Sequence, residues 1–183
     1  NWTPIRPNYH VLTDQDYISR LQTYAQAGFN LVRVWGGGLI EKQIFYDLCD
    51  ELGLMVWQEF PLSSSALDNT PPSDPQAIEQ LVQIAASAIE RRGGHACVLL
   101  WCGGNELQSG ATRQTAGCGW PWDLTHPCLA ALDQTVQALA PGVRFLPTSA
   151  YGPTFLAFEP EFGKGLHHNV HGPWIMPGSL EEW

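Results

Sequence analysis

A carboxylic acid and a carboxamide follow the longest uninterrupted apolar stretch of the chain. That stretch is residues 96–102, and Gly103 and Gly104 separate it from Asn105 and Glu106. The two glycines leave room for a ligand beside the carboxyl group. A carboxylic acid in partly apolar surroundings keeps its proton to a higher pH and can protonate a leaving oxygen. Glu106 is therefore a candidate general acid; the alternative is a glutamate at a helix N-terminus that interacts with the helix dipole.

Aromatic and polar side chains lie at the ends of three successive apolar stretches. They are Trp35, Trp57 with Glu59, and Trp101. A sugar pocket needs flat aromatic faces for the C–H surfaces of the ring and fixed polar groups for the hydroxyls. A single tryptophan could equally be a core residue, but the chain contains eight. Three of them at consecutive strand ends favour a carbohydrate-binding pocket that these four residues would line.

The elements that must position these residues alternate between helix and strand. Helical periodicity covers residues 13–27, 41–52, 75–92 and 127–139, and short apolar runs at 29–35, 54–60, 96–102 and 143–146 predict strands. Thr13 with Asp16, and Asp74 followed by Pro75, are typical helix starts. This alternation predicts an α/β fold with a parallel sheet, either doubly wound or closed into a barrel.

The position of the polar residues distinguishes the two architectures. No G-x-G-x-x-G follows a predicted strand, as a dinucleotide-binding fold would require. The candidate residues instead follow the C-terminal ends of successive strands, which converge on one mouth in a barrel. We therefore predict a (β/α)₈ TIM barrel.

Composition and charge exclude several partners. The 183 residues carry a net charge of −9, from 9 Lys and Arg against 18 Asp and Glu, without a basic cluster. Phosphate contacts need clustered Lys and Arg, so we expect no nucleic-acid partner. The longest apolar stretch is far shorter than the roughly 20 residues that span a bilayer, so no membrane helix is expected.

Cysteine and histidine spacing predicts no metal site. The five cysteines lack a paired CxxC pattern and are expected to be buried free thiols, although a Cys118–Cys128 disulfide stays open as an alternative. His167, His168 and His171 suggest a triple-histidine site, but adjacent residues on a strand point to opposite faces. We therefore expect neither a metal ion nor a cofactor.

Five ordered motifs carry a family resemblance. They are Asn1-Trp2, RVWGGG at 33–38, FYDLCDELG at 45–53, VWQEF at 56–60 and LWCGGNE at 100–106. In this order they resemble the catalytic barrel of glycoside hydrolase family 2, and within it the β-mannosidase-like branch. The resemblance is strong over residues 1–106 and loose over the remainder.

The resemblance implies a role for each matching residue. Glu106 would be the acid/base, and Asn105 would contact the sugar 2-hydroxyl. Arg33 and Trp35 would border the sugar pocket. The implied activity is retaining hydrolysis of terminal β-linked mannose through a covalent glycosyl-enzyme. A related β-glucosaminidase or β-galactosidase is the alternative within the superfamily, and a non-catalytic carbohydrate-binding fragment is the alternative from another class.

The later part of the chain matches the family less closely. Residues 167–174 resemble the sixth-strand region, which would add His171 and Trp174 to the pocket. A retaining glycosidase needs a second carboxylate, which the resemblance places after the seventh strand. Glu161 precedes the His171 segment in a Pro- and Gly-rich loop, so we expect it to be a loop carboxylate and the nucleophile to follow Trp183.

The motif order also predicts how much of a barrel the chain contains. A complete barrel typically has about 250 residues, and Asn1-Trp2 matches the end of the first strand. Residues 1–183 are therefore expected to form one partial barrel domain, roughly strands two to six. Unpaired parallel edges in such a domain predict self-association.

Overall fold

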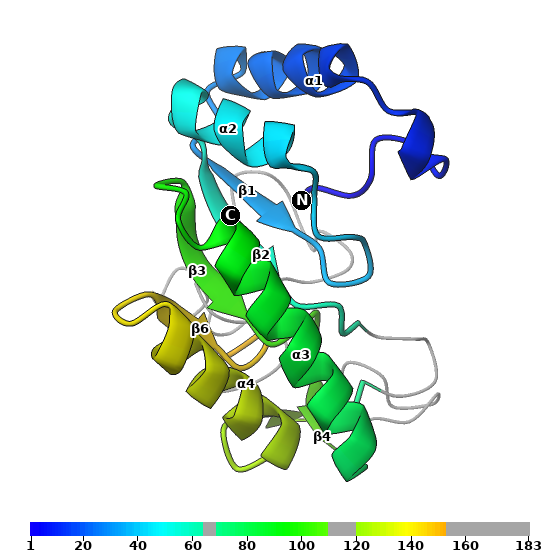
Figure 1. Ribbon diagram of the computed structural model, residues 1–183, viewed down its shortest axis with the longest axis vertical. Coiled ribbons are helices and arrows are strands. Elements are labelled where there is room, and N and C mark those ends of the chain that lie inside the picture. The colour runs from blue at the N-terminus through cyan, green and yellow to red at the C-terminus, as the bar shows by residue number, and fades with distance from the viewer. Residues whose placement is uncertain (64–68, 110–119, 153–183) are drawn as a thin grey trace, which may run out of the picture.

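A parallel sheet forms the centre of the structure (Figure 1). The computed structural model describes residues 1–63, 69–109 and 120–152. Within them the sheet has the order β1-β2-β3-β6. Its strands are Leu31–Val34, Met55–Glu59, Val98–Cys102 and Arg144–Leu146. Every adjacent pair is parallel, and Trp2 adds a parallel bridge to Val34 beyond β1. The predicted parallel α/β arrangement is thus confirmed, with strands slightly shorter than expected.

Four α-helices pack against one face of this sheet, α1 beside α2 and α3 beside α4 (Figure 1). They are α1 Asp14–Gln26, α2 Gln43–Leu52, α3 Pro75–Arg92 and α4 Pro127–Leu139, and a short 3₁₀ helix, η1, covers Tyr9–Val11. The predicted helix starts at Thr13 and Asp74 are confirmed. The Asp16 carboxylate accepts the Thr13 N–H at 2.9 Å, and the Asp74 carboxylate accepts the Ala77 N–H at 2.9 Å. These side chains satisfy groups at the helix start that have no intrahelical partner.

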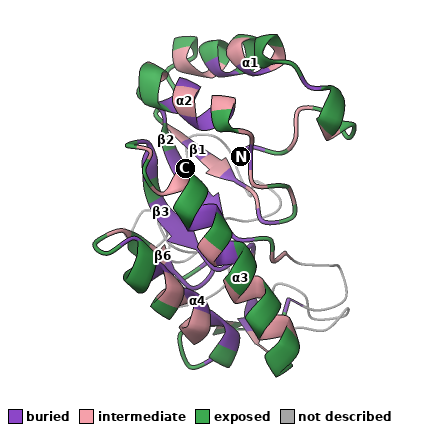
Figure 2. Ribbon diagram, in the orientation of Figure 1, coloured by how far each residue is buried: buried purple, intermediate pink, exposed green. Residues whose placement is uncertain are grey.

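The core lies between the sheet and the helices. Figure 2 shows buried strands behind helices whose outer sides are exposed. Alternate strand residues point to opposite faces of a sheet, so Val32, Val56 and Trp101 join this core. The opposite, inner face carries a smaller cluster of Leu100, Cys102 and Leu146 with Trp57 packed against it. A parallel sheet with helices outside and an apolar inner face is the arrangement of an incomplete α/β barrel.

A short antiparallel strand pair follows β3 that the sequence did not predict. β4 Gln108–Ser109 pairs antiparallel with β5 Trp120–Pro121. Two-residue strands are too short to show a period of two, so they leave no pattern in the sequence.

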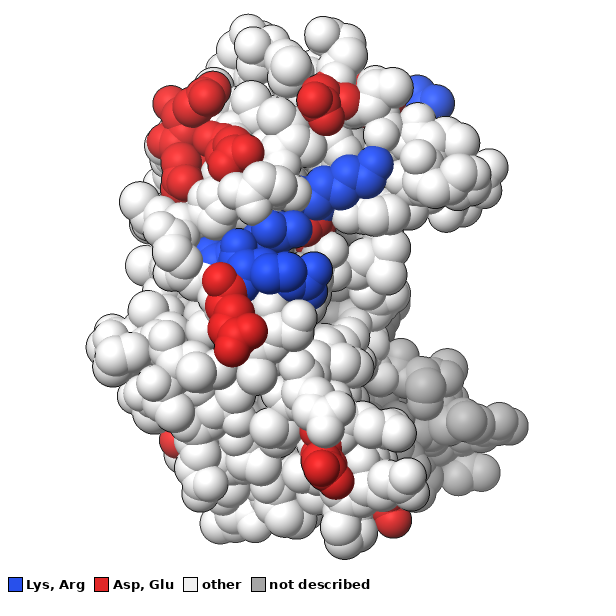
Figure 3. Space-filling model, in the orientation of Figure 1, with Lys and Arg blue, Asp and Glu red and all other residues white. Residues whose placement is uncertain are grey.

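Surface charge is unevenly distributed on the face drawn in Figure 3. Lys and Arg side chains gather there in one band across the middle of the molecule, with acidic side chains above and below it. No helix in the described ranges is long and apolar enough to cross a membrane.

Cys49, Cys97, Cys102 and Cys128 are buried free thiols, as expected. Several other predicted features fall outside the described residues, namely Cys118, Glu161, His167, His168, His171 and Trp174.

Candidate active site

Glycines allow the C-terminal ends of β1, β2 and β3 to approach one another closely. A Cβ at Gly36 would overlap the carbonyl oxygen of Leu62, and a Cβ at Gly104 would lie 2.6 Å from the same atom. A Cβ at Gly103 would overlap the carbonyl oxygen of Pro147, just after β6. Backbone atoms at these contacts cannot move aside, so only glycine fits. The glycines that end the strands therefore bring the predicted polar residues together.

Arg33, on the inner face of β1, connects this strand to the N-terminus, to β2 and to the segment after β3. Its Nε donates to Glu59 Oε1 at 2.7 Å, its Nη1 donates to Asn1 Oδ1 at 3.1 Å, and its Nη2 donates to Asn105 Oδ1. The guanidinium also lies 5.9 Å from the centre of the Trp57 ring, within the range of a cation–π interaction. The structure thus brings Arg33, Trp57, Glu59 and Asn105 together.

Glu59 lies behind Arg33 and faces no solvent. Its side chain is 0% exposed, and its second oxygen, Oε2, accepts the Gly36 N–H at 2.7 Å. Burial raises the pKa of Glu59, and the charge and hydrogen bond of Arg33 together with the Gly36 N–H oppose that rise. These partners favour the ionised form, so Glu59 neutralises Arg33. Because the Glu59 side chain is fully buried, its predicted direct contact with a sugar is corrected: Glu59 can influence a bound sugar only through Arg33.

Glu106 is the residue after Asn105 in the sequence and is partly exposed. Its backbone has φ of 53°, the left-handed conformation that residues with a Cβ rarely adopt. The carboxyl group lies near enough to Glu59 for its charge to help raise the pKa of Glu59. Side chains of Asn69, Thr148 and Ser149 hold the backbone here.

Sequence reasoning missed these three supporting residues. Thr148 and Ser149 had a usable signal, because they follow the predicted strand 143–146 just as Asn105 follows its strand. Asn69 had none, since no predicted strand ends next to it.

The three predicted tryptophans occupy different environments. Trp57 is partly buried on the inner face of the sheet, beside Arg33. Trp35 is partly buried, and its ring lies over Gly37, where a Cβ would overlap it. Trp101 is 0% exposed and stacks on Phe60, with ring centroids 5.3 Å apart. It lies between the sheet and the helices, so the expectation that it lines the pocket is corrected. The cause is strand alternation, since its neighbours on β3 take the inner face.

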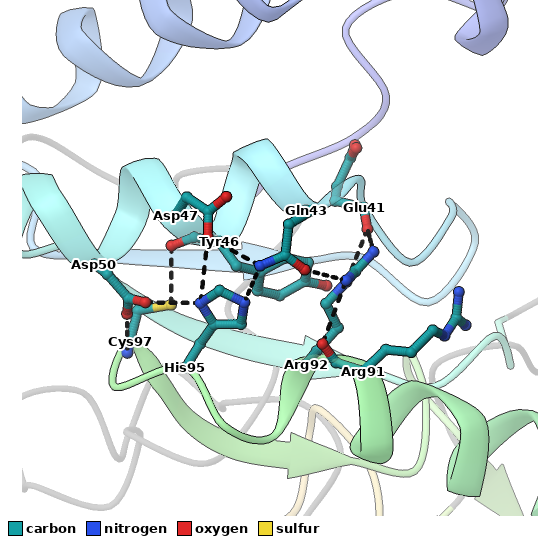
Figure 4. Close-up of polar contacts among 9 residues, drawn as sticks. All are labelled: Glu41, Gln43, Tyr46, Asp47, Asp50, Arg91, Arg92, His95 and Cys97. Carbon is teal, nitrogen blue, oxygen red and sulfur yellow. Dashed lines mark hydrogen bonds and ion pairs between the residues drawn. The ribbon is translucent and has the colours of Figure 1, made fainter.

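Among the described residues, the group best suited to hold a metal ion lies at the opposite end of the sheet. Ligand atoms of Asp50, His95 and Cys97 lie within 4.8 Å of one another (Figure 4). Both Asp50 oxygens already accept hydrogen bonds, from His95 Nδ1 and the Cys97 N–H, each at 2.7 Å. Burial also raises the pKa of the Cys97 thiol, which disfavours the thiolate that binds metals. Asp50 therefore serves to connect α2 to the turn before β3.

Comparison with known proteins identifies the fold family. Residues 10–118 match the family described as glycosyl hydrolases family 2, TIM barrel domain. Beta-mannosidase of Rattus norvegicus is 37% identical over 106 residues, which cover 58% of this chain and 12% of that protein. Beta-mannosidase B of Aspergillus fumigatus is 26% identical over 185 residues, covering 93% of this chain and 21% of that protein.

Solved structures agree with this family. Beta-D-mannosidase from Dictyoglomus thermophilum superimposes with a TM-score of 0.71 at 32% identity, covering 84% of this chain and 18% of that one. Beta-glucuronidase 3 of Bacteroides uniformis shares the fold at 24% identity with a TM-score of 0.56. The chain thus spans about 12% to 21% of the length of these two mannosidase relatives from rat and Aspergillus. A family match over more than half of the chain, together with the parallel sheet and its outer helices, shows that the chain belongs to the TIM barrel domain of glycosyl hydrolase family 2.

Proposed function

We propose that this chain supplies the acid/base half of a retaining β-mannosidase. The observation that carries the proposal is the position of Glu106, partly exposed at the C-terminal end of β3 beside the part-buried Arg33–Glu59–Asn105 network. Barrel enzymes keep their catalytic groups at these strand ends. The relatives from rat and Dictyoglomus, both named as mannosidases, support mannose as the sugar.

Glu106 would act twice in the reaction. In the first step its carboxyl proton passes to the glycosidic oxygen while the C1–O bond breaks and a second carboxylate forms an ester with C1. In the second step Glu106 accepts a proton from water while the water oxygen bonds to C1 and the ester bond breaks. Retaining enzymes place the two carboxyl groups about 5–5.5 Å apart. We propose that the nucleophile is a glutamate in sequence that follows Trp183.

Arg33 and Glu59 would orient the group that binds the sugar 2-hydroxyl. Asn105 Oδ1 is occupied by Arg33, which leaves its Nδ2 as the donor toward neighbouring oxygens, and it already lies 3.5 Å from Ser63 Oγ. A fixed donor of this kind costs no reorganisation when the substrate binds. Trp35 and Trp57 would supply the aromatic surfaces, and His171 and Trp174 stay predicted sugar contacts in the part of the chain beyond the described residues.

The experiment that tests the proposal is Glu106→Gln in a protein that contains this barrel together with the sequence after it. We expect hydrolysis of unactivated β-mannosides to fall about 10²- to 10⁴-fold, because general acid–base catalysis contributes that much. Glu90→Gln is the matched control, since Glu90 is exposed on α3. Near-normal turnover by Glu106→Gln would contradict the assignment.

A second measurement distinguishes the alternatives. Aryl β-glycosides of mannose, glucose, galactose and N-acetylglucosamine, assayed with the unsubstituted protein, identify the sugar. Preference for glucosaminide or galactoside would select the related enzymes of the superfamily. Saturable binding of mannose with no turnover of any glycoside would select a non-catalytic carbohydrate-binding role.

A further inference from the structure

The backbone at Glu106 adopts a conformation that its own sequence does not favour. Glu106 is the sole residue other than glycine with a positive φ in the described ranges. A Cβ makes this left-handed region unfavourable, so the conformation persists only where surrounding contacts determine it. Neighbouring groups must therefore hold Glu106 in this conformation.

Three side chains from two other segments make these contacts. Ser149 Oγ accepts the Glu106 N–H at 2.9 Å, and Thr148 Oγ1 accepts the Leu107 N–H at 2.7 Å. Asn69 Nδ2 donates to the carbonyl oxygen of Glu106 at 2.8 Å. Thus both N–H groups that flank the Glu106 side chain, and the carbonyl between them, are bonded to side chains.

The supporting residues are themselves firmly held. Thr148 is 0% exposed and Asn69 is 6% exposed. The Ser149 N–H donates back to the carbonyl of Gly104 at 3.0 Å, and the Gln108 N–H donates to the carbonyl of Asn69 at 3.1 Å. The backbone on both sides of Glu106 is therefore fixed to the end of β6 and to the segment before α3. Glu106 itself is partly exposed.

We propose that Thr148 and Ser149 are positioning residues that hold Glu106 in its left-handed conformation, with Asn69 as their third support. This inference rests on the proposed acid/base role of Glu106. The two hydroxyls act through the backbone of Glu106 and Leu107, and they set the direction in which the carboxyl group enters the pocket. A catalytic group displaced by about 1 Å can lose about 10²-fold in rate, so the supports matter for the reaction and not for stability alone.

The test compares two substrates that depend differently on acid catalysis. Thr148→Val and Ser149→Ala remove one hydroxyl each, and Thr148→Ser keeps it. Phenyl β-mannoside has a poor leaving group that needs a proton, whereas 2,4-dinitrophenyl β-mannoside has a leaving group that departs without one. We expect kcat/KM for the phenyl substrate to fall between about ten- and a hundredfold in Thr148→Val and Ser149→Ala. For the dinitrophenyl substrate we expect a change of less than about twofold, because its first step needs little general acid.

Conservative and control variants exclude a general loss of structure. Thr148→Ser should restore most of the phenyl activity. Thr135→Val is the matched control, because the Thr135 hydroxyl donates to Ala131 within α4, away from Glu106. A smaller folded fraction would lower the activity on both substrates equally, so an equal loss on both would overturn the positioning role. If Thr148→Val does not fold, Ser149→Ala and Thr148→Ser decide the question.

A double-mutant cycle separates this inference from the proposed function. In a Glu106→Gln background, Thr148→Val or Ser149→Ala should cause no further loss on the phenyl substrate, because the group they position is gone. An additional loss equal to that in the unsubstituted protein would overturn the positioning role while leaving the role of Glu106 intact. If Glu106→Gln itself keeps full phenyl activity, the proposed function fails instead, and the positioning inference fails with it.

Discussion

Arg33 is the residue on which the polar network depends. Its guanidinium donates to side chains of three other segments, and its partner Glu59 is fully buried. A buried ion pair costs desolvation for both charges, but removing one partner leaves the other charge without compensation. The pair therefore fixes Arg33 in place, and the cost of losing it should appear in stability as well as in catalysis.

Arg33→Met should destabilise the protein by about 3 kcal/mol at neutral pH, because Glu59 would stay buried without its counter-charge. Adding Glu59→Gln should recover much of this loss, since the double variant buries no charge. Urea unfolding at pH 8 and pH 5 measures both effects. The loss in Arg33→Met should shrink at pH 5, where Glu59 with its raised pKa can take up a proton. Arg20→Met, on the exposed side of α1, is the control; equal destabilisation at the two pH values would contradict the explanation.

At the scale of elements, α4 begins with an unusual cap. The His126 Nδ1 accepts the Cys128 N–H at 3.2 Å, and its Nε2 lies 3.3 Å from Ser73 Oγ. An imidazole nitrogen that accepts an N–H cannot carry a proton, so His126 is neutral here with its hydrogen on Nε2. Burial lowers the pKa of His126 below its ordinary value of 6.5. This cap on α4 therefore forms only while the histidine is unprotonated.

The cap predicts a loss of stability in mild acid. The unfolded chain binds a proton at His126 near the ordinary pKa, whereas the folded chain does so only at lower pH. Stability from this group is therefore full above about pH 6.5 and declines as the pH falls toward the lowered folded-state value. His126→Asn keeps a capping side chain without titration, so its free energy of unfolding should depend less on pH between 7 and 5 than that of the unsubstituted protein. An unchanged pH dependence, with His10→Asn as the exposed control, would contradict the assignment.

The connection between α2 and β3 gives a second prediction for an element. Burial opposes ionisation of Asp50, but hydrogen bonds from His95 and Cys97 outweigh it and lower its pKa. Asp50→Ala should cost about 1–3 kcal/mol by leaving these donors unpaired. Asp47→Ala is the matched control, because Asp47 is 46% exposed and 4.0 Å from His95. Thermal unfolding measures both, and similar losses would show that Asp50 has no special role. With its lowered pKa, Asp50 contributes above its ordinary value of 3.8 and loses its contribution as the pH falls below that value.

Local patterns predicted most elements, whereas contacts between distant segments could not be predicted. Thr13 and Asp74 begin their helices as expected because helix capping depends on a few adjacent residues. His126 was missed since histidine is an uncommon cap. Trp101 was placed in the pocket because an apolar strand gives no sign of which face each residue takes. Thr148 and Asn69 support the backbone at Glu106 although they lie 42 and 37 residues from it in the chain. Contacts between segments so far apart depend on the completed fold.

At the scale of the whole molecule, the two outer edges of the sheet differ. β1 is covered in part by the bridge from Trp2. β6 pairs with β3 on one side, and within the described ranges no strand pairs with its other side. The edge strands of a partial barrel expose N–H and C=O groups that can pair with another chain. We therefore propose, as the sequence predicted, that the 183-residue chain by itself associates with further copies.

Salt dependence would show what drives this association. The net charge of −9 makes copies repel one another, and added salt screens that repulsion. If backbone pairing and apolar contact at the edge hold the copies together, the mass measured by light scattering should rise with protein concentration and rise further between 0.05 M and about 0.5 M NaCl. Association through charged patches would instead weaken as salt is added. A longer polypeptide that includes the sequence after Trp183 should stay at lower mass under the same conditions, because further strands would complete the barrel and leave no edge unpaired. A clean monomer of the 183-residue chain at high concentration in both salt conditions would contradict the proposal.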